Sequence, residues 1–201
     1  MARTRPVPAE ARLAPSANRM LAAMPADFLA RLRRPPQQVF LPRGMVLYES
    51  GVLQRYVYFP ADAVVSLVYV LENGAPTRTA LVGNDGLVGV APIMGGGGTP
   101  SCGVVLIPGT AFRMPAVRLT DEFQTEPDLM RLLLRYIQAL ITQMAQTAVC
   151  YRHHSIRQQL CVLFLLILDR RSSMRIPLTQ EMIAHTLGVR REGGTEAACS
   201  L

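Results

Sequence analysis

The sequence changes its periodicity near residue 126, and this change limits what the chain can fold into. Residues 37–114 contain short runs of β-branched and aromatic residues, which glycine and proline separate at intervals of roughly ten residues. From residue 127 onward, apolar residues recur at three- and four-residue spacing for more than 20 residues. Many short strands followed by one long helix favour a β-sandwich, jelly roll or barrel with a helix attached behind it.

The predicted strands are separated by residues that favour turns. Asn73 and Gly74 form the clearest hairpin signal, because this pair readily adopts the left-handed backbone that a tight β-turn needs. The glycines at residues 95–98 predict a flexible loop. The runs that we expect to be strands are QVFL, MVLYE, YVYFP, VVSLVYVL, RTALVG, GLVGVAPIM, CGVVLI and AFRM.

The region before the strands has a different character. Residues 1–17 are rich in proline, alanine and arginine, which predicts a disordered tail. Residues 18–33 show helical periodicity that is broken near Pro25, because proline interrupts helical hydrogen bonding.

The segment after the strands predicts a long amphipathic helix over residues 127–152. Its apolar stripe consists of Leu129, Leu133, Ile137, Leu140 and Met144. Further apolar residues beside the stripe make it wide enough to pack on the chain's own barrel and on a second copy of the chain. We assign the stripe to dimerisation, and packing within the core of one chain remains the open alternative. A shorter helix is predicted over residues 155–168.

Residues 178–201 have the pattern of a helix-turn-helix. Thr179 is a suitable N-cap for a first helix. Met182, Ile183 and Leu187 give that helix one apolar face, and Gly188 supplies the turn. A second helical pattern begins at residue 189. Two short helices joined by a glycine-containing turn are typical of the DNA-reading unit of repressors, in which the second helix enters the major groove.

The second helix of this unit has a sequence that favours helix formation poorly. Gly193 and Gly194 lie inside it, and each glycine costs about 1 kcal/mol relative to alanine. The pattern therefore predicts a helix-turn-helix whose second helix is short and marginal on its own.

The charge distribution also favours a DNA-binding C-terminal end. The net charge is +7, and every basic residue is arginine. Residues 151–201 carry seven arginines against four acidic residues, whereas residues 44–150 carry six against eight. A basic end on a near-neutral body is typical of a nucleic-acid reader attached to a sensing domain. The candidates for phosphate contacts are Arg157, Arg170, Arg171 and Arg175, with a solvated arginine surface as the alternative.

Several other classes of protein are not indicated. The four cysteines lie far apart without zinc or disulfide spacing, so we expect reduced thiols in a cytoplasmic protein. The longest apolar run has nine residues, too few to span a membrane. Histidine is absent from residues 1–152, which argues against an enzyme with a metal inside the β-domain. We expect no catalytic activity, no metal and no cofactor.

The order of a β-roll, a long helix, a short helix and a helix-turn-helix resembles the Crp/Fnr family of transcription regulators. The segments that carry the resemblance are LPRGMVLYESG, YVYFP, VVSLV, ALVGNDGLVG, LLLRYIQALITQMAQTAVCYRHHSIRQQL and LTQEMIAHTLGVRRE. The resemblance implies an α+β fold with an N-terminal double-stranded β-helix of jelly-roll type, a long dimerisation helix and a C-terminal winged helix-turn-helix that is truncated, with its wing absent. The corresponding domains are a tail at residues 1–17, a sensor roll at 18–126, the dimerisation helix at 127–152 and an incomplete reader at 153–201.

The resemblance also implies a function. The chain is expected to be a homodimeric, DNA-binding regulator that senses an unidentified signal through its roll. Its expected partners are a palindromic double-stranded DNA site, a second copy of itself and RNA polymerase. The residues that match the family's DNA contacts are Thr179, Gln180, Arg190, Arg191, Glu192 and Glu196, of which arginine reads guanine and glutamate reads cytosine. The alternative is a dimerising, ligand-sensing roll that has lost specific DNA binding.

The family's known effector motifs are not present in this sequence. Members that bind cyclic AMP hold the ribose with a glutamate after a glycine, and hold the phosphate with an arginine before a serine or threonine. Here Val90 follows Gly89 and Pro100 precedes Ser101, so a phosphate would lack its bidentate partner.

The cofactors of other family members are not indicated either. No cysteine precedes Cys102, which excludes the N-terminal cluster that holds an iron–sulfur centre. His153, His154 and His185 do not form a ligand set, so we expect structural or surface roles for them. The ligand of the roll remains unidentified.

Overall fold

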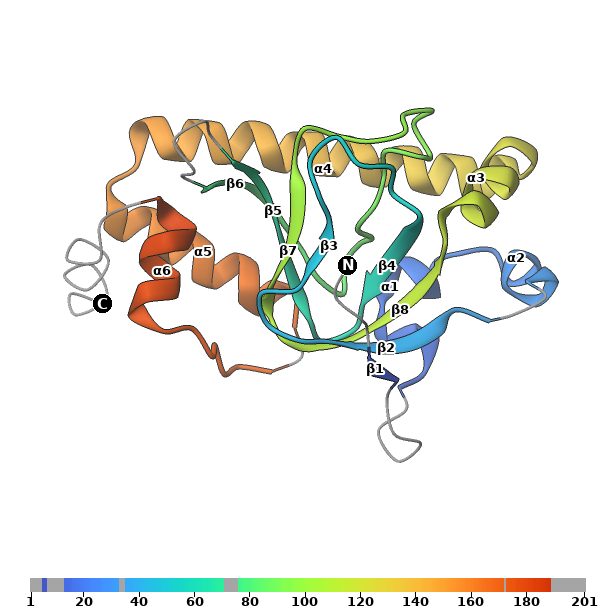
Figure 1. Ribbon diagram of the computed structural model, residues 1–201, viewed down its shortest axis with the longest axis horizontal. Helices are drawn as coiled ribbons and strands as arrows, with labels where there is room; N and C mark the ends of the chain where they lie inside the picture. The colour runs from blue at the N-terminus through green and yellow to red at the C-terminus, as the bar shows by residue number, and fades with distance from the viewer. Residues whose placement is uncertain (1–4, 7–12, 33–34, 71–75, 172, 189–201) are drawn as a thin grey trace.

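The computed structural model describes residues 5–6, 13–32, 35–70, 76–171 and 173–188 (Figure 1). Two antiparallel four-stranded sheets form a roll. One sheet has the order β1 (Arg5–Pro6), β2 (Gln37–Leu41), β8 (Gly109–Pro115) and β4 (Tyr56–Pro60). The other has the order β3 (Val46–Tyr48), β7 (Cys102–Ile107), β5 (Val64–Val70) and β6 (Pro76–Val82). This architecture confirms the predicted α+β fold with a jelly-roll-like β-domain.

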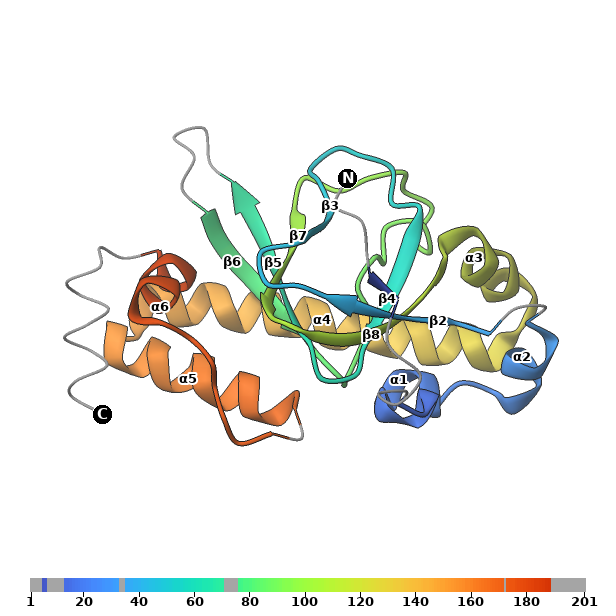
Figure 2. The same ribbon diagram turned by 60° about the horizontal axis from the view of Figure 1, so that its bottom comes forward.

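Helices come both before and after the strands in the sequence, and they pack against the roll (Figures 1 and 2). Before the strands lie a 3-10 turn at Pro15–Ala17 and the short helices α1 (Arg19–Ala22) and α2 (Ala26–Arg31). After the strands come α3 (Ala116–Thr125), α4 (Pro127–His153), α5 (Ile156–Asp169) and α6 (Gln180–Leu187). The long helix α4 runs along the whole roll, and α5 turns back beside it.

Local sequence explains where the long helices begin and end. Pro127 occupies the first turn of α4, where its missing N–H costs nothing. Asp128 in the first turn and Arg152 in the last turn complement the helix dipole. Ser155 then caps α5, because its hydroxyl accepts from the Gln158 backbone N–H while the Gln158 side chain accepts from the Ser155 N–H. The chain therefore turns sharply between α4 and α5.

Three apolar clusters hold these layers together. The first joins the outer face of β4 and β8 to α1, α2, α3 and the first half of α4, and includes Phe28, Phe59 and Leu133. The second fills the inside of the roll and includes Leu41, Val65 and Val105. The third joins the outer face of β5, β6 and β7 to α5 and α6. Its members include Leu81, Ile107, Leu160, Leu163 and Ile183.

The structure differs from the sequence-based expectation in three places. GLVGVAPIM, expected to be a strand, makes a single bridge between Val88 and Tyr58 and then turns at residues 91–95. The reason is local, because Gly89 has a φ of +105° and leaves the extended region. Helix α3 was not expected. Within the segment predicted to be a disordered tail, Arg5–Pro6 pairs with β2 and Pro15–Ala17 forms the 3-10 turn.

Other expectations concern turns. The helical segment before the strands is broken at Pro25, as the sequence predicts. The Asn73–Gly74 hairpin turn lies outside the described residues, although the flanking strands β5 and β6 pair antiparallel up to Val70 and Pro76.

Replacing Leu163 by alanine is expected to lower the free energy of unfolding by about 2–5 kcal/mol, because its side chain is fully buried between α5 and the sheet. Leu165→Ala is the matched control on the same helix, since Leu165 is 65% exposed. Urea unfolding of both variants tests the prediction. Equal losses for the two variants would contradict the packing of α5 on the roll.

Candidate functional site

Helix α4 has two different apolar faces. Leu129 and Leu133 are fully buried in the chain's own core, and Ile137 and Leu140 are 7% and 6% exposed. Met144 is half-buried and packs on the interior of the roll. The sequence assigned these five residues to dimerisation. Leu129, Leu133, Ile137 and Leu140 are enclosed by their own protomer, so the burial of these four favours the alternative of packing within the core of one chain, whereas Met144 is only half-buried.

A second apolar stripe on α4 remains uncovered. It consists of Met130, Leu134, Ile141 and Val149, which are 36%, 49%, 52% and 51% exposed. At 100° per residue, these positions fall within an arc of roughly 100° that adjoins the buried face. Leu129 and Met130 therefore belong to different faces, although they are neighbours in sequence. Sequence periodicity detects the combined width of the two faces but not the line that divides them.

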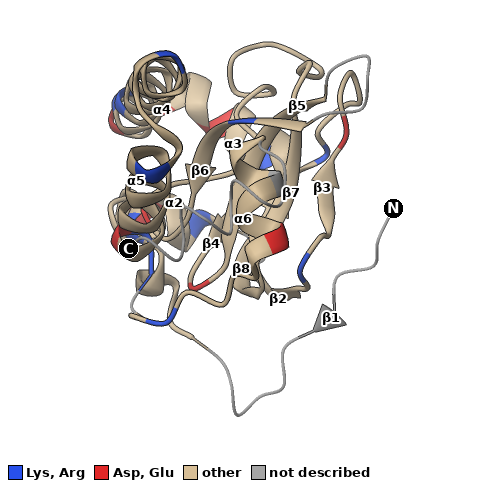
Figure 3. Cartoon of the chain, turned by 90° about the vertical axis from the view of Figure 1, so that its left-hand side faces the viewer, with Lys and Arg blue, Asp and Glu red and all other residues tan. Residues whose placement is uncertain are grey.

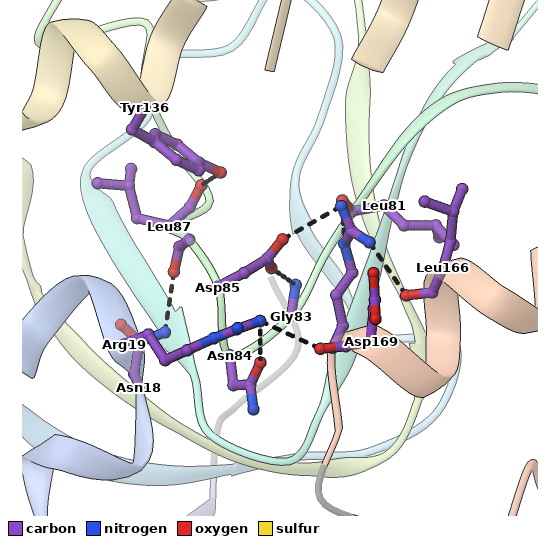
Figure 4. A network of polar contacts seen from close by, with 12 residues as sticks. Asn18, Arg19, Leu81, Gly83, Asn84, Asp85, Leu87, Tyr136, Leu166 and Asp169 are labelled. Carbon is purple, nitrogen blue, oxygen red and sulfur yellow. Dashed lines mark hydrogen bonds and ion pairs between the residues drawn. The ribbon is translucent and has the colours of Figure 1, made fainter. Parts of the chain in front are cut away.

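The turn Asn84–Asp85–Gly86 of the roll contacts the segment that follows α5 (Figure 4). Arg170, directly after α5, pairs with Asp85 at an Nη2–Oδ2 distance of 3.1 Å. It also donates from Nε to the Leu81 carbonyl and from Nη1 to the Leu166 carbonyl, at 3.2 and 3.1 Å. The Arg170 side chain is only 11% exposed, and each of its three nitrogens contacts an oxygen of the same chain.

The same turn also contacts the N-terminal helix and α4 (Figure 4). Arg19 donates to the side-chain oxygen of Asn84 and to the carbonyl of Asp169, at 3.3 and 3.1 Å. The Tyr136 hydroxyl of α4 donates to the Leu87 carbonyl at 2.7 Å. Burial raises the pKa of Tyr136 well above its usual range, so this hydroxyl keeps its proton at physiological pH. The turn, α1, α4 and the segment after α5 thus meet in one place.

The arginines proposed for phosphate contacts separate into two pairs. Arg170 is committed to Asp85, and Arg171 donates to the carbonyls of Asp62 and Arg175 at 3.1 and 2.7 Å. These two arginines join the C-terminal segment to the roll. Arg157 and Arg175 are exposed, which agrees better with the expected phosphate contacts. Figure 3 shows basic positions on α4 and α5 at this end of the molecule.

Helix α6 has the features expected of the first helix of the reader. The Thr179 hydroxyl accepts from the Met182 N–H at 3.3 Å, which confirms the predicted N-cap. Ile183 and Leu187 are buried, and Gly188 ends the helix with a φ of +67°. The two buried residues pack against the roll as well as against α5. Thr179 and Gln180 lie exposed at the start of the helix. The positions Arg190, Arg191, Glu192 and Glu196, with Gly193 and Gly194, lie outside the described residues.

A cavity of about 290 Å³ lies between the roll and α4. Its walls come from β5, from the segment 87–101 and from Leu140 and Met144 of α4. Hydroxyls line one part of it, where Thr99 Oγ1 and Ser101 Oγ are 3.2 Å apart and Tyr48 bonds to Ser101. Burial raises the pKa of Tyr48, so its phenol also stays protonated. The cavity brings together Val90, Pro100 and Ser101, which the sequence comparison with cyclic-AMP-binding proteins had singled out.

Solved structures resemble this fold, although comparisons of the sequence alone find no relative. No protein-family profile and no curated protein matches the sequence. FixK2 from Bradyrhizobium japonicum superposes with a TM-score of 0.71 at 16% identity, over 84% of this chain and 85% of that one. A putative regulator of the Crp/Fnr family from Eubacterium rectale gives 0.71 at 9% identity, over 92% and 87%. The regulator CLP from Xanthomonas campestris, described as responsive to c-di-GMP, gives 0.67 at 14% identity, over 88% and 91%.

The chain has the fold of the Crp/Fnr transcription regulators. Within this fold, sequence reasoning found α4 and the α6 N-cap but missed three groups. Asp85 lies in the segment ALVGNDGLVG but was given no role, and Gln54, which lines the cavity, was not singled out. Arg78 was also missed. It is 3% exposed and lies over the Tyr151 ring of α4 at 5.7 Å, and burial lowers its pKa. Only the tertiary structure shows where these three side chains lie.

The described residues contain neither a metal site nor a membrane-spanning helix. Across the described ranges, no group of three or more histidine, cysteine, aspartate or glutamate side chains is placed to hold a metal ion. Within the same part of the chain, no helix combines the length and apolar character that crossing a membrane requires.

Asp85→Asn is expected to lower the free energy of unfolding by about 1–3 kcal/mol, because it leaves the nearly buried Arg170 without its charged partner. It should also speed tryptic cleavage after Arg170 and Arg171, as the segment leaves the roll more often. Asp128→Asn is the control, since the Asp128–Arg131 pair is 82% and 75% exposed and contributes little. Urea unfolding and timed proteolysis measure both effects. Unchanged proteolysis in Asp85→Asn would contradict the role of this ion pair.

Proposed function

We propose that the chain is a homodimeric transcription regulator of the Crp/Fnr type, and that it dimerises through the uncovered stripe of α4. The observation that carries the proposal is this stripe, Met130, Leu134, Ile141 and Val149, on the long helix of a Crp/Fnr fold. Exposed apolar side chains at helical spacing mark a surface that another helix covers. A second copy of α4 supplies the same stripe, as a twofold interface requires.

Dimerisation through α4 would place two readers on one DNA duplex. A twofold dimer fits a palindromic site whose halves are separated by one helical turn. In this proposal Thr179 and Gln180 contact the backbone or bases near the start of α6. Thr179 uses its oxygen as acceptor for the helix cap and keeps its O–H available to donate to a phosphate. Arg190, Arg191, Glu192 and Glu196 are the proposed base-reading residues, and RNA polymerase is a further proposed partner.

The phosphate contacts of this proposal come from the exposed arginines. Arg157 lies near the start of α5, and Arg175 lies in the segment before α6. Among the described residues, neither side chain has an interaction that a phosphate contact would break, whereas Arg170 would have to leave Asp85. Each phosphate contact makes DNA affinity more sensitive to salt. A protein that acts on DNA in this way works in the cytoplasm and needs no catalytic activity.

The roll is the proposed sensor. Its cavity is walled in part by Leu140 and Met144, and the uncovered stripe lies on the same helix. A change in the cavity can therefore reach the dimer interface through one rigid element, without a relay of many residues. The Asp85 turn offers a second connection, since it touches both Tyr136 and the segment after α5.

The double variant Leu134→Arg/Ile141→Arg is expected to be monomeric, because it places two charges in the proposed interface. Monomerisation should lower affinity for a palindromic DNA site at least tenfold, since a monomer gains nothing from the second half-site. Sedimentation velocity measures the mass, and fluorescence anisotropy measures binding to a palindrome selected from random DNA at two salt concentrations.

Leu165→Arg serves as the matched control, because Leu165 is also exposed, at 65%, but lies on α5. A double variant that remains dimeric would refute dimerisation through this stripe. If the wild type dimerises but selects no DNA sequence, the regulator proposal fails and a dimerising, ligand-sensing roll takes its place.

A further inference from the structure

The outer face of the sheet β3–β7–β5–β6 carries an open groove of about 580 Å³ beside α6. Strand alternation explains its floor, because Val68 of β5 faces outward while its neighbour Leu67 belongs to the core inside the roll. Met182 and Thr186 of α6 contribute to the opposite wall. This groove is distinct from the cavity between the roll and α4, since the two share no lining residue.

Apolar side chains remain uncovered in this groove. Val46 of β3 is 39% exposed and Val70 of β5 is 57% exposed, although both lie on strands of a packed sheet. Only two of the lining residues are charged, Arg43 just before β3 and Glu181 on α6. An exposed apolar patch with a polar rim marks a surface that another segment or molecule covers.

The chain leaves α6 at the edge of this groove. A Cβ on Gly188, directly after α6, would lie 4.0 Å from the carbonyl oxygen of Pro76, and Pro76 lines the groove. Near the start of α6, Arg43 donates to the Pro177 carbonyl at 2.7 Å. The groove therefore runs along α6, from the residue that ends this helix back to the residues that precede it. Residues 189–201, which follow α6, lie outside the described residues.

The segment after α6 is long enough to follow the groove and to enter it. Helix α6 has 8 residues and is about 12 Å long. Seven residues of extended chain, 189–195, span up to about 23 Å, so they can bring Glu196 back to Arg43. The five residues after Glu196 have the sequence AACSL, and these small or apolar side chains suit the valine-lined floor.

We propose that residues 196–201, the docking segment, bind in this groove of their own chain, with Glu196 paired to Arg43. The Arg43 guanidinium has five N–H donors, of which the Pro177 carbonyl takes one, so it can pair with a carboxylate as well. Docking holds residues 189–195 beside α6. It therefore competes with base reading by Arg190 and Arg191, a consequence that rests on the proposed function.

Two native cysteines test the docking without DNA. Cys102 lines the groove, and Cys199 belongs to the docking segment. Oxidation of the full chain by diamide should join these two about tenfold faster than it joins Cys199 to Cys161, because docking raises their effective concentration. Cys161 is the matched control, since it is half-buried like Cys102 but lies on α5. Mass spectrometry of tryptic peptides identifies each pair, and mixing with ¹⁵N-labelled protein separates pairs within one chain from pairs between chains.

An exchange of charges tests the contact between Glu196 and Arg43. Glu196→Arg should slow formation of the Cys102–Cys199 pair roughly twofold to fivefold, as expected for an exposed ion pair. Arg43→Glu should slow it to a similar extent. The double variant Arg43→Glu/Glu196→Arg should restore the wild-type rate, a result that misfolding cannot produce.

Val46→Asp tests the apolar floor. It should slow the Cys102–Cys199 pair about fivefold or more, because the docked segment would bury a carboxylate. Phe40→Asp is the matched control, since Phe40 is also 39% exposed but lies on β2 and does not line the groove. Val46→Asp should also raise affinity for DNA, although it adds a negative charge, because it releases the segment that reads bases.

The proposal is overturned if Cys199 joins Cys161 as fast as Cys102, if no pair forms, or if the pairs form mainly between two chains. A double charge variant that stays slow, or a Val46→Asp variant as fast as the wild type, also overturns it. Because cross-linking is measured without DNA, these failures are distinct from failure of the regulator proposal. Confirmed docking with unchanged DNA affinity in Val46→Asp would support the groove and refute its control of base reading.

Discussion

The fold depends on the burial of one face of α4 against the roll. Leu129 and Leu133 enter the cluster on the outer side of β4 and β8, and Leu140 enters the cluster inside the roll. One helix therefore closes two separate cores, and each buried leucine contributes roughly 1.5–3 kcal/mol through removal of its apolar surface from water. This arrangement fixes the rotation of α4 about its axis. Once that rotation is fixed, so is the direction in which Leu134 and Ile141 point.

A second constraint joins the C-terminal segment to the roll. The ion pair between Arg170 and Asp85, with the bonds from Arg170 to two carbonyls, holds the end of α5 beside the turn that follows β6. Ile183 and Leu187 add an apolar contact farther along the chain. Helix α6 is thus packed on the roll. Any rearrangement that freed this helix would expose those two side chains and separate the ion pair.

Sequence reasoning predicted the elements that depend on local pattern. The start of α4 at Pro127, the break at Pro25 and the cap at Thr179 follow from short-range rules, and the structure has all three. Four of the five α4 residues assigned to dimerisation are buried in their own chain, because periodicity does not distinguish a face that packs on the same chain from one that does not. The expected strand at GLVGVAPIM failed because glycine conformation outweighed β-propensity.

The candidate sites were harder to predict because their residues are far apart in sequence. Asp85 and Arg170 are separated by 85 positions, and Gln54 and Leu140 line the same cavity only in the folded chain. Arg170 was expected to contact a DNA phosphate, but its partner in the structure is a carboxylate of the same chain. Buried polar partnerships of this kind depend on the tertiary arrangement, which no local pattern encodes.

Gly83 and Gly86, on either side of Asn84 and Asp85, allow α4 and the segment after α5 to pack closely against this turn. A methyl group on Gly83 would lie 2.5 Å from the Arg170 Cβ, and one on Gly86 would overlap the Tyr136 ring. Only backbone therefore separates α4 on one side of the turn from the segment after α5 on the other. Replacing either glycine by alanine would push one of these elements away from the turn, although neither glycine contacts a ligand or a base. Natural variation at these two positions should therefore be scarce wherever this close packing is retained.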